Sequence, residues 1–242
     1  MTDSIGATPK ALQRAQVMTA LRAASNKTGV DFDYLVKTAQ RESNFDPSAK
    51  ASTSSATGLF QFTSETWLNV LDRYGAKHGV KTDGLSRDEL LDMRKDASLS
   101  AAMAGELAGE NGKILARKLG REATTAELYT AHFMGPRDAA RLITAARDNA
   151  PGVAADMFPR AALANANVFR GADGAKLTPS QLYTKLTGVD VNLADAGRVT
   201  ANFTPPPMTV DAAVMLQAQL GTAALNSSLM TALFGLQEDK KA

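Results

Sequence analysis

The chain has 242 residues, of which 44% are hydrophobic, and its formal net charge at neutral pH is +2. This length allows one large domain or a domain with an appendage. Such a small charge, with no long run of Lys and Arg, argues against nucleic acid as a partner. Cysteine is absent, which excludes disulfides, thiolate chemistry and Cys-based zinc sites. Two histidines are too few for a His-rich metal site, and we expect no cofactor.

Apolar residues recur at helical spacing through most of the chain, and no segment alternates with a period of two, so the predicted fold class is all-α. The predicted helices cover residues 8–26, 31 or 33 to 42, 64–74, a short stretch from 86, 96–110, 125–134, 137–147, 159–166 and 178–186. Ser86 and Glu89 form a capping box. The Ala/Leu-rich helix 96–110 is the predicted buried central helix, with Gly112 just past its end.

The pattern of apolar residues at helical spacing weakens after residue 187. We predict a domain over 1–187, a linker over 188–209 that contains the triple proline Pro205–Pro207, and a C-terminal helical tail over 210–242. Residues 210–236 are apolar at helical spacing, and this face needs a partner. The partner is the domain itself, a second copy of the chain or another protein.

Membrane insertion and ordinary secretion both lack a signal in the sequence. No apolar run is long enough to span a bilayer, so we expect no transmembrane segment. The first ten residues have no basic region followed by an apolar region, which differs from an ordinary secretory signal.

The most informative stretch runs from residue 40 to residue 63. Glu42 and Ser43 end a predicted helix, a loop of small polar residues follows over 47–57, and Gly58-Leu59-Phe60-Gln61-Phe62 comes next. Cleavage of a glycosidic bond needs a proton on the leaving oxygen. A free glutamate is a poor acid at neutral pH, because its pKa is about 4.3, but burial beside apolar groups raises the pKa of a glutamate. Glu42 is therefore the candidate acid.

A second carboxylate is the usual requirement for hydrolysis of this bond. Asp46 lies one turn beyond Glu42, and Asp33 lies at the far end of the same predicted helix. Neither spacing argues for a catalytic pair.

The two-part motif resembles that of the soluble lytic transglycosylases, which have a lysozyme-like fold. Their Glu-Ser pair and Gly-Leu-Met-Gln motif match Glu42-Ser43 and Gly58-Leu59-Phe60-Gln61, with Phe60 in place of Met. The resemblance extends over about residues 12–186. It implies that Glu42 is the only acid and base, that Gln61 binds sugar, and that Ser43 supports the acid. Phe60 and Phe62 are either core residues or a platform for sugar.

A third motif of that family, Ala-Tyr-Asn-Ala-Gly, is altered here to Ala131-His132-Phe133-Met134-Gly135. The family's tyrosine orients the acid and its asparagine contacts sugar, so His132 and Phe133 stand at candidate substrate-binding positions. Tyr129 lies one helical turn before His132 and could supply the phenol. His132 is either a packed, hydrogen-bonded histidine or a site residue.

The resemblance implies a peptidoglycan lytic transglycosylase that acts between N-acetylmuramic acid and N-acetylglucosamine and leaves 1,6-anhydro ends. The expected place of action is the periplasm or cell wall. Two alternatives stay open: a hydrolytic muramidase of the same fold, and a weakly active wall-binding scaffold of an envelope machine. In each case the 210–236 segment could dock on an envelope protein.

Overall fold

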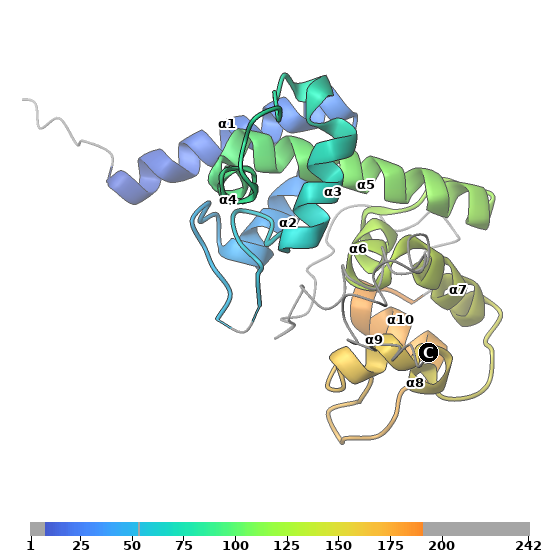
Figure 1. The fold of residues 1–242 in the computed structure, drawn as a ribbon. Coiled ribbons are helices and arrows are strands. Elements are labelled where there is room, and N and C mark those ends of the chain that lie inside the picture. Colours follow the sequence, from blue (N-terminus) through green and yellow to red (C-terminus); the bar gives the residue numbers. More distant parts are fainter. Residues whose placement is uncertain (1–7, 53, 191–242) are drawn as a thin grey trace, which may run out of the picture.

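The computed structural model describes residues 8–52 and 54–190, and this part of the chain is mostly helical (Figure 1). The helices are α1 (Pro9–Thr28), α2 (Phe32–Ser43), α3 (Ser64–Tyr74), α4 (Arg87–Asp92), α5 (Ala97–Leu119), α6 (Thr125–Met134), α7 (Pro136–Arg147), α8 (Ala154–Met157), α9 (Pro159–Ala164) and α10 (Pro179–Thr187), with 3₁₀ turns η1 (Ala76–His78) and η2 (Met93–Lys95). Within the described residues, β-structure is limited to isolated bridges. The all-α prediction is confirmed.

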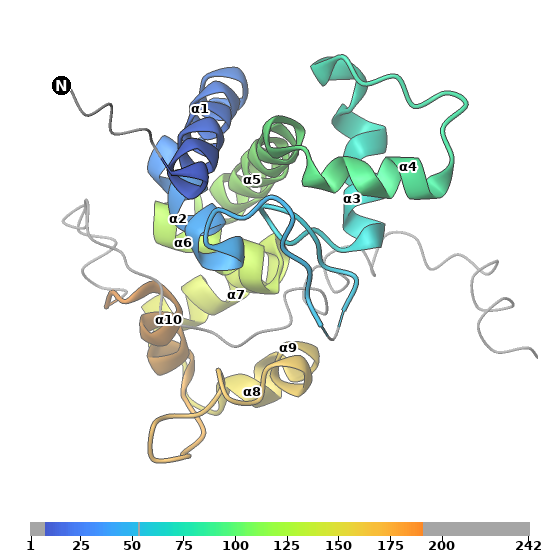
Figure 2. The same ribbon diagram turned by 90° about the vertical axis from the view of Figure 1, so that its left-hand side faces the viewer.

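The N-terminal part of the domain is built around α1 and α5, which lie side by side in both views (Figures 1 and 2). Small residues on α5 allow this close approach. A Cβ added to Gly105 would lie 2.5 Å from the hydroxyl oxygen of Thr28 on α1. A hydrophobic core joins these helices to α2, α3 and the 58–62 turn, with Trp67 fully buried at its centre.

Helix α5 is longer than the sequence predicted. It does not end before Gly112 but continues to Leu119, where Gly120 takes the left-handed conformation that ends the helix. Gly112 is accommodated because it faces α6: an added Cβ would lie 3.3 Å from the side chain of Leu128. Tight packing between two helices therefore explains this glycine better than a helix end does.

Helix α6 lies between two hydrophobic cores. Tyr129 packs into the N-terminal core, whereas Phe133 and Met134 pack into a second core formed with α7, α8, α9 and α10. Most of its side chains are buried, and His132 is among the few that are partly exposed. A helix that is buried nearly all round is held by both of its neighbours. Residues on α6 are thus placed relative to both halves of the domain.

The N-terminus of α6 is anchored by a buried acid. Glu127 is fully buried and receives two hydrogen bonds from the Arg121 guanidinium, each 2.8 Å long, and one from the backbone N–H of Thr124. Thr124 and Glu127 form a capping box, which satisfies backbone donors that the first helical turn would leave unpaired. This anchor sets the start of the helix that carries Tyr129 and His132.

The remaining predicted helices are present with ends that differ by a few residues, and the predicted capping box at Ser86 is confirmed. The boundary at residue 187 stays a prediction. The tail over 210–242, its 210–236 segment and most of the 188–209 linker lie outside the described residues.

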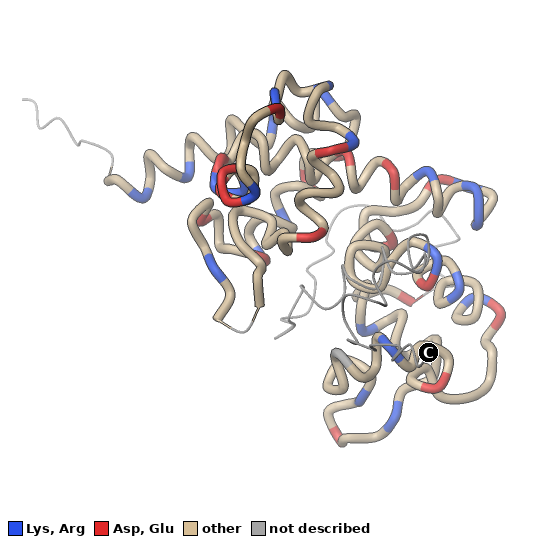
Figure 3. The backbone as a smooth tube through the Cα atoms, in the orientation of Figure 1, with Lys and Arg blue, Asp and Glu red and all other residues tan. Residues whose placement is uncertain are grey.

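Charged side chains of both signs are interspersed along the described chain (Figure 3). No helix within the described ranges is long and apolar enough to cross a membrane.

Candidate active site

Helix α2 presents a stripe of polar side chains toward the centre of the domain. Tyr34, Thr38 and Glu42 are spaced four residues apart and share one helix face. The Asp31 side chain caps the helix start. At the other end, Asn44 and Phe45 both have positive φ angles, 51° and 65°. Such conformations are rare for residues other than glycine and cluster at functional sites. They turn the chain sharply just after Glu42.

Ser43 joins the two sequence motifs. Its hydroxyl lies 2.9 Å from the carbonyl oxygen of Leu59 and 3.1 Å from that of Ala39 in its own helix. A single hydroxyl proton can serve one of these acceptors at a time. The contact with Leu59 holds the end of α2 against the 58–62 turn.

The 58–62 turn is closed by the Gln61 side chain. Its amide nitrogen donates to the carbonyl oxygens of Gly58, at 2.8 Å, and Ala49, at 3.2 Å. Gln61 has a φ of 49°, so it is another strained residue near the end of α2. The amide nitrogen therefore ties the turn to the base of the 47–57 loop.

Arg94, which sequence reasoning did not single out, holds the same loop from the other side. Its guanidinium donates to the carbonyl oxygens of Ser55, at 2.6 Å, and Phe62, at 3.1 Å. Only 8% of the residue is exposed, and burial lowers the pKa of the Arg94 guanidinium. The positions of two separate parts of the loop thus depend on one buried cation.

We expect Arg94→Met to destabilise the protein by about 1–3 kcal/mol, because it leaves backbone acceptors without their donor. It should also speed tryptic cleavage after the exposed Lys50 in the released loop. Urea unfolding and timed digestion measure the two effects. Arg117→Met removes an exposed arginine of α5 and is the matched control. Equal effects from both variants would contradict the role of Arg94.

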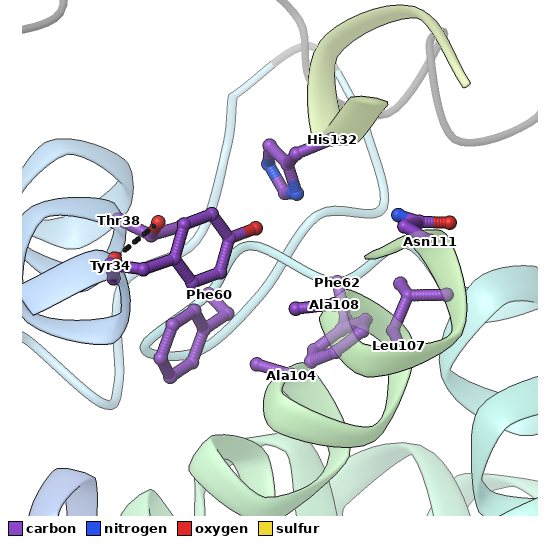
Figure 4. Close-up of a pocket in the computed structure, with 9 residues that line it drawn as sticks. All are labelled: Tyr34, Thr38, Phe60, Phe62, Ala104, Leu107, Ala108, Asn111 and His132. Atoms are coloured by element: carbon purple, nitrogen blue, oxygen red, sulfur yellow. Dashed lines mark hydrogen bonds between the residues drawn. The ribbon is translucent and has the colours of Figure 1, made fainter. Parts of the chain in front are cut away.

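A cavity of about 20 Å³ lies where α2, α5, α6 and the 58–62 turn meet (Figure 4). Its walls come from four separate segments: Tyr34 and Thr38 from α2, Phe60 and Phe62 from the turn, Ala104, Leu107, Ala108 and Asn111 from α5, and His132 from α6. Aromatic and aliphatic side chains form one side, while a phenol, an amide and an imidazole converge on the other. A space of this size holds about one water molecule.

Glu42 and His132 approach one another beside this cavity. The distance from Nε2 of His132 to Oε1 of Glu42 is 3.5 Å, and the two side chains are 17% and 11% exposed, respectively. The carboxyl group is therefore mostly withdrawn from water, and it contacts an imidazole that belongs to a different helix. This contact brings together the first and third sequence motifs.

Tyr129 occupies a different position from the one expected. It is buried beneath the Arg41 guanidinium, whose carbon lies 4.2 Å from the centre of its ring, and it does not line the cavity. Burial raises the pKa of the Tyr129 phenol, and the negative charge of Glu42 adds to this effect while Arg41 opposes it. The substitution of Tyr129 for the family's tyrosine stays a prediction.

Phe133 lies apart from the cavity, and its role as a sugar contact stays a prediction. Its side chain is buried in the second hydrophobic core and does not line the cavity. On α6, one residue changes the direction of the side chain by about 100°, so neighbours in the motif face different surroundings. Phe133 supports the fold at a position where the family has an asparagine.

The two alternative carboxylates lie away from the cavity. Asp46 accepts hydrogen bonds from the backbone N–H and hydroxyl of Ser48, and these bonds lower the pKa of the Asp46 carboxyl. Asp33 lies in the first turn of α2, about two and a half turns from Glu42. Neither residue lines the cavity.

Sequence reasoning missed Tyr34, Thr38 and Asn111. The signal for the first two was available, because their spacing from Glu42 places all three on one helix face. Asn111 gave a weaker signal, as an amide in an Ala-rich helix that is buried in the structure. Only the packing of α5 against α6 and α2 brings it to the cavity.

The described residues contain no group of three or more His, Asp or Glu side chains arranged to hold a metal ion. The features that converge are a mostly buried acid, a motif turn locked to its helix and a partly polar cavity.

Residues 19–120 match the family model for the transglycosylase SLT domain. This stretch of the chain is accordingly a transglycosylase SLT domain with the all-α, lysozyme-like fold of that family, which confirms the resemblance drawn from the first two motifs. The matched stretch contains Glu42, Ser43 and the 58–62 turn and ends at the residue after α5. Tyr129, His132 and Phe133 lie beyond it.

Proposed function

We propose that this protein is a peptidoglycan lytic transglycosylase that cleaves between N-acetylmuramic acid and N-acetylglucosamine with Glu42 as its only acid and base. The observation that carries the proposal is the state of Glu42: it is only 11% exposed, it follows the family motif, and no Asp or Glu is found among the described residues that line the adjacent cavity.

The proposed reaction needs one proton, which Glu42 donates in the first step and replaces in the second. Glu42 first donates its proton to the glycosidic oxygen as the bond from this oxygen to C1 of the muramic acid breaks. The resulting carboxylate then accepts the proton of the C6 hydroxyl as the C6 oxygen bonds to C1. The product is a 1,6-anhydro sugar, no water is consumed, and Glu42 ends in its starting protonation state.

Neighbouring groups support this role through positioning. The Ser43 contact with Leu59 holds the acid against the turn, and Gln61 on this turn is the proposed sugar-binding amide. Phe60 and Phe62 are buried and form an apolar wall of the adjacent cavity. A peptidoglycan substrate implies that the protein acts in the periplasm or the cell wall.

A hydrolytic muramidase is the second candidate, and the cavity beside His132 favours it. Tyr34, Asn111 and His132 could hold one water molecule there, and a water placed near C1 would give hydrolysis. The two functions differ in whether water enters the product.

We expect digestion of purified sacculi to release muropeptides with anhydromuramic ends, lighter by one water than reducing ends. The reason is that no second carboxylate, which would activate a water, is found among the described residues that line the cavity beside Glu42. Mass spectrometry of the released muropeptides measures the difference, with a known muramidase as the reference digest. Mainly reducing ends would overturn the transglycosylase proposal and support the muramidase.

A further inference from the structure

One polar side chain in the cavity beside Glu42 is buried without a partner. Asn111 on α5 is only 4% exposed, and no hydrogen bond joins its side-chain amide to another residue of the described chain. The amide lies on the same side of the cavity as the imidazole of His132 (Figure 4). A buried amide costs stability unless a bound group pairs with it. In a helix where alanine would serve the fold, this cost points to an amide that is kept for binding.

The cavity has room for a single hydroxyl group. Its volume of about 20 Å³ is the space that about one water molecule takes. Phe60 and Phe62 form an apolar wall against which a methylene can pack, and the amide of Asn111 and the phenol of Tyr34 lie opposite. Burial raises the pKa of the Tyr34 phenol, which therefore stays protonated and can donate a hydrogen bond. A hydroxymethyl arm, with one apolar carbon and one hydroxyl, matches this lining.

The cavity adjoins the proposed acid through one side chain. His132 lines the cavity, and its Nε2 lies 3.5 Å from Oε1 of Glu42. Of the lining residues, Leu107 and His132 are partly exposed and the others are buried, so an arm of the substrate enters past these two. In the proposed reaction the C6 hydroxyl must come within hydrogen-bond reach of the Glu42 carboxylate. The C6 arm of the muramic acid fits the cavity in both size and place, whereas the acetamido group on C2 is larger than a space for one water.

We propose that the cavity is the subsite for the C6 hydroxymethyl group of the muramic acid, and that Asn111 is a substrate-binding residue that decides whether this hydroxyl or a water molecule reacts at C1. This inference rests on the proposed function of Glu42. The Asn111 amide donates a hydrogen bond to the C6 oxygen and leaves the proton of that hydroxyl free for the Glu42 carboxylate. With the arm in place, the cavity has no room for water.

The occupant of the cavity sets the product. When the C6 hydroxyl reacts, its oxygen bonds to C1, its proton passes to the Glu42 carboxylate, and a 1,6-anhydro end forms. When a water reacts, its oxygen bonds to C1, one of its protons passes to Glu42, and the other stays on the new C1 hydroxyl, which is a reducing end. Both routes restore the protonated acid, so Glu42 does not select between them. The selection falls to the group that holds the C6 arm in place and keeps water out.

The first test compares two variants that change the cavity in opposite ways. Asn111→Ala removes the amide and widens the cavity, so that water can enter, whereas Asn111→Leu removes the amide and fills the cavity with an apolar side chain. Full-length proteins digest sacculi in ¹⁸O-labelled water, which marks the ends made by water, and mass spectrometry measures both kinds of end. Asn111→Ala should release anhydro ends at least about tenfold more slowly and produce labelled reducing ends. Asn111→Leu should be as slow or slower, without labelled ends.

The control is Asn69→Ala, which makes the same change at an exposed position of α3 and should match the wild type in rate and product. Release of anhydro ends alone by folded Asn111→Ala, or a wild-type rate in Asn111→Leu, would overturn the role of Asn111 and leave the transglycosylase reaction in place. Mainly labelled reducing ends from the wild type would overturn that reaction itself, and the C6 subsite with it.

The second test needs no activity. An amide that the fold requires lowers stability when it is lost, whereas an unpaired buried amide does not, and alanine is a better helix former than asparagine. Asn111→Ala should therefore unfold in urea at a midpoint equal to or above that of the wild type, although its activity falls. A clearly lower midpoint would show that the amide serves the fold and would overturn its role in binding.

Discussion

Glu42→Gln should reduce the release of muropeptides from sacculi by at least about 10²-fold while the protein stays folded. The amide has nearly the size of the carboxyl group but supplies no transferable proton, and loss of a general acid–base group typically costs ~10²–10⁴-fold in rate. Glu42 is also the base of the second step in the proposed reaction, so both half-reactions should fail. Initial rates of muropeptide release measure the effect.

The control for this experiment is Glu122→Gln, which makes the same chemical change at an exposed position. Circular dichroism and thermal unfolding of both variants should match the wild type. Near wild-type release by folded Glu42→Gln would overturn the assignment of Glu42 as the acid, and lost release by Glu122→Gln would show that the assay reports something other than this site.

Gly58→Ala should be the most damaging single-methyl change near the site. Gly58 has a φ of 85°, and an added Cβ would lie 2.2 Å from the backbone carbonyl oxygen of Arg94. Neither group is the flexible end of a side chain, so the turn or η2 must move. Relief of overpacking of this kind costs about 1–3 kcal/mol in addition to the backbone strain. The displaced turn carries Phe60 and Gln61, so activity should fall as well.

Gly84→Ala separates the cost of the close contact from the cost of the left-handed backbone. Gly84 has a similar φ of 78°, but an added Cβ would meet no atom within 4 Å. This variant should lose only the cost of a left-handed alanine, about 1–2 kcal/mol, and should retain activity. Urea unfolding and sacculus digestion of the two variants measure the difference. Equal losses of stability would show that the contact with Arg94 is not what requires glycine at position 58.

The position of the site explains why distant residues are expected to matter. Glu42 lies on a helix of the N-terminal core, whereas His132 comes from α6, which is held between both cores and anchored by the buried Glu127. Their separation therefore depends on how α6 packs against α2 and α5. A change that shifts α6 would alter the contact of Glu42 with His132 without touching either residue.

The sequence alone determined the features of this protein that depend on short-range patterns. Helical spacing and capping residues predicted the helices, since a cap or an apolar stripe needs only a few neighbouring residues. The Glu42-Ser43 pair and the Gly58 turn were found in the same way. Helix ends were less well predicted where packing overrides propensity, and Gly112 is the example because its place inside α5 depends on contact with Leu128.

Only the tertiary structure decided which residues meet at the site. His132 lies 90 positions after Glu42 in the numbering, and no local pattern indicates that their side chains are 3.5 Å apart. The structure also places His132 at the cavity and Phe133 in a core, and it shows Arg94 holding two parts of one loop. These placements likewise depend on side chains from separate helices. Contacts of this kind form only when helices pack in three dimensions, and a helical pattern in one segment carries no information about its partner.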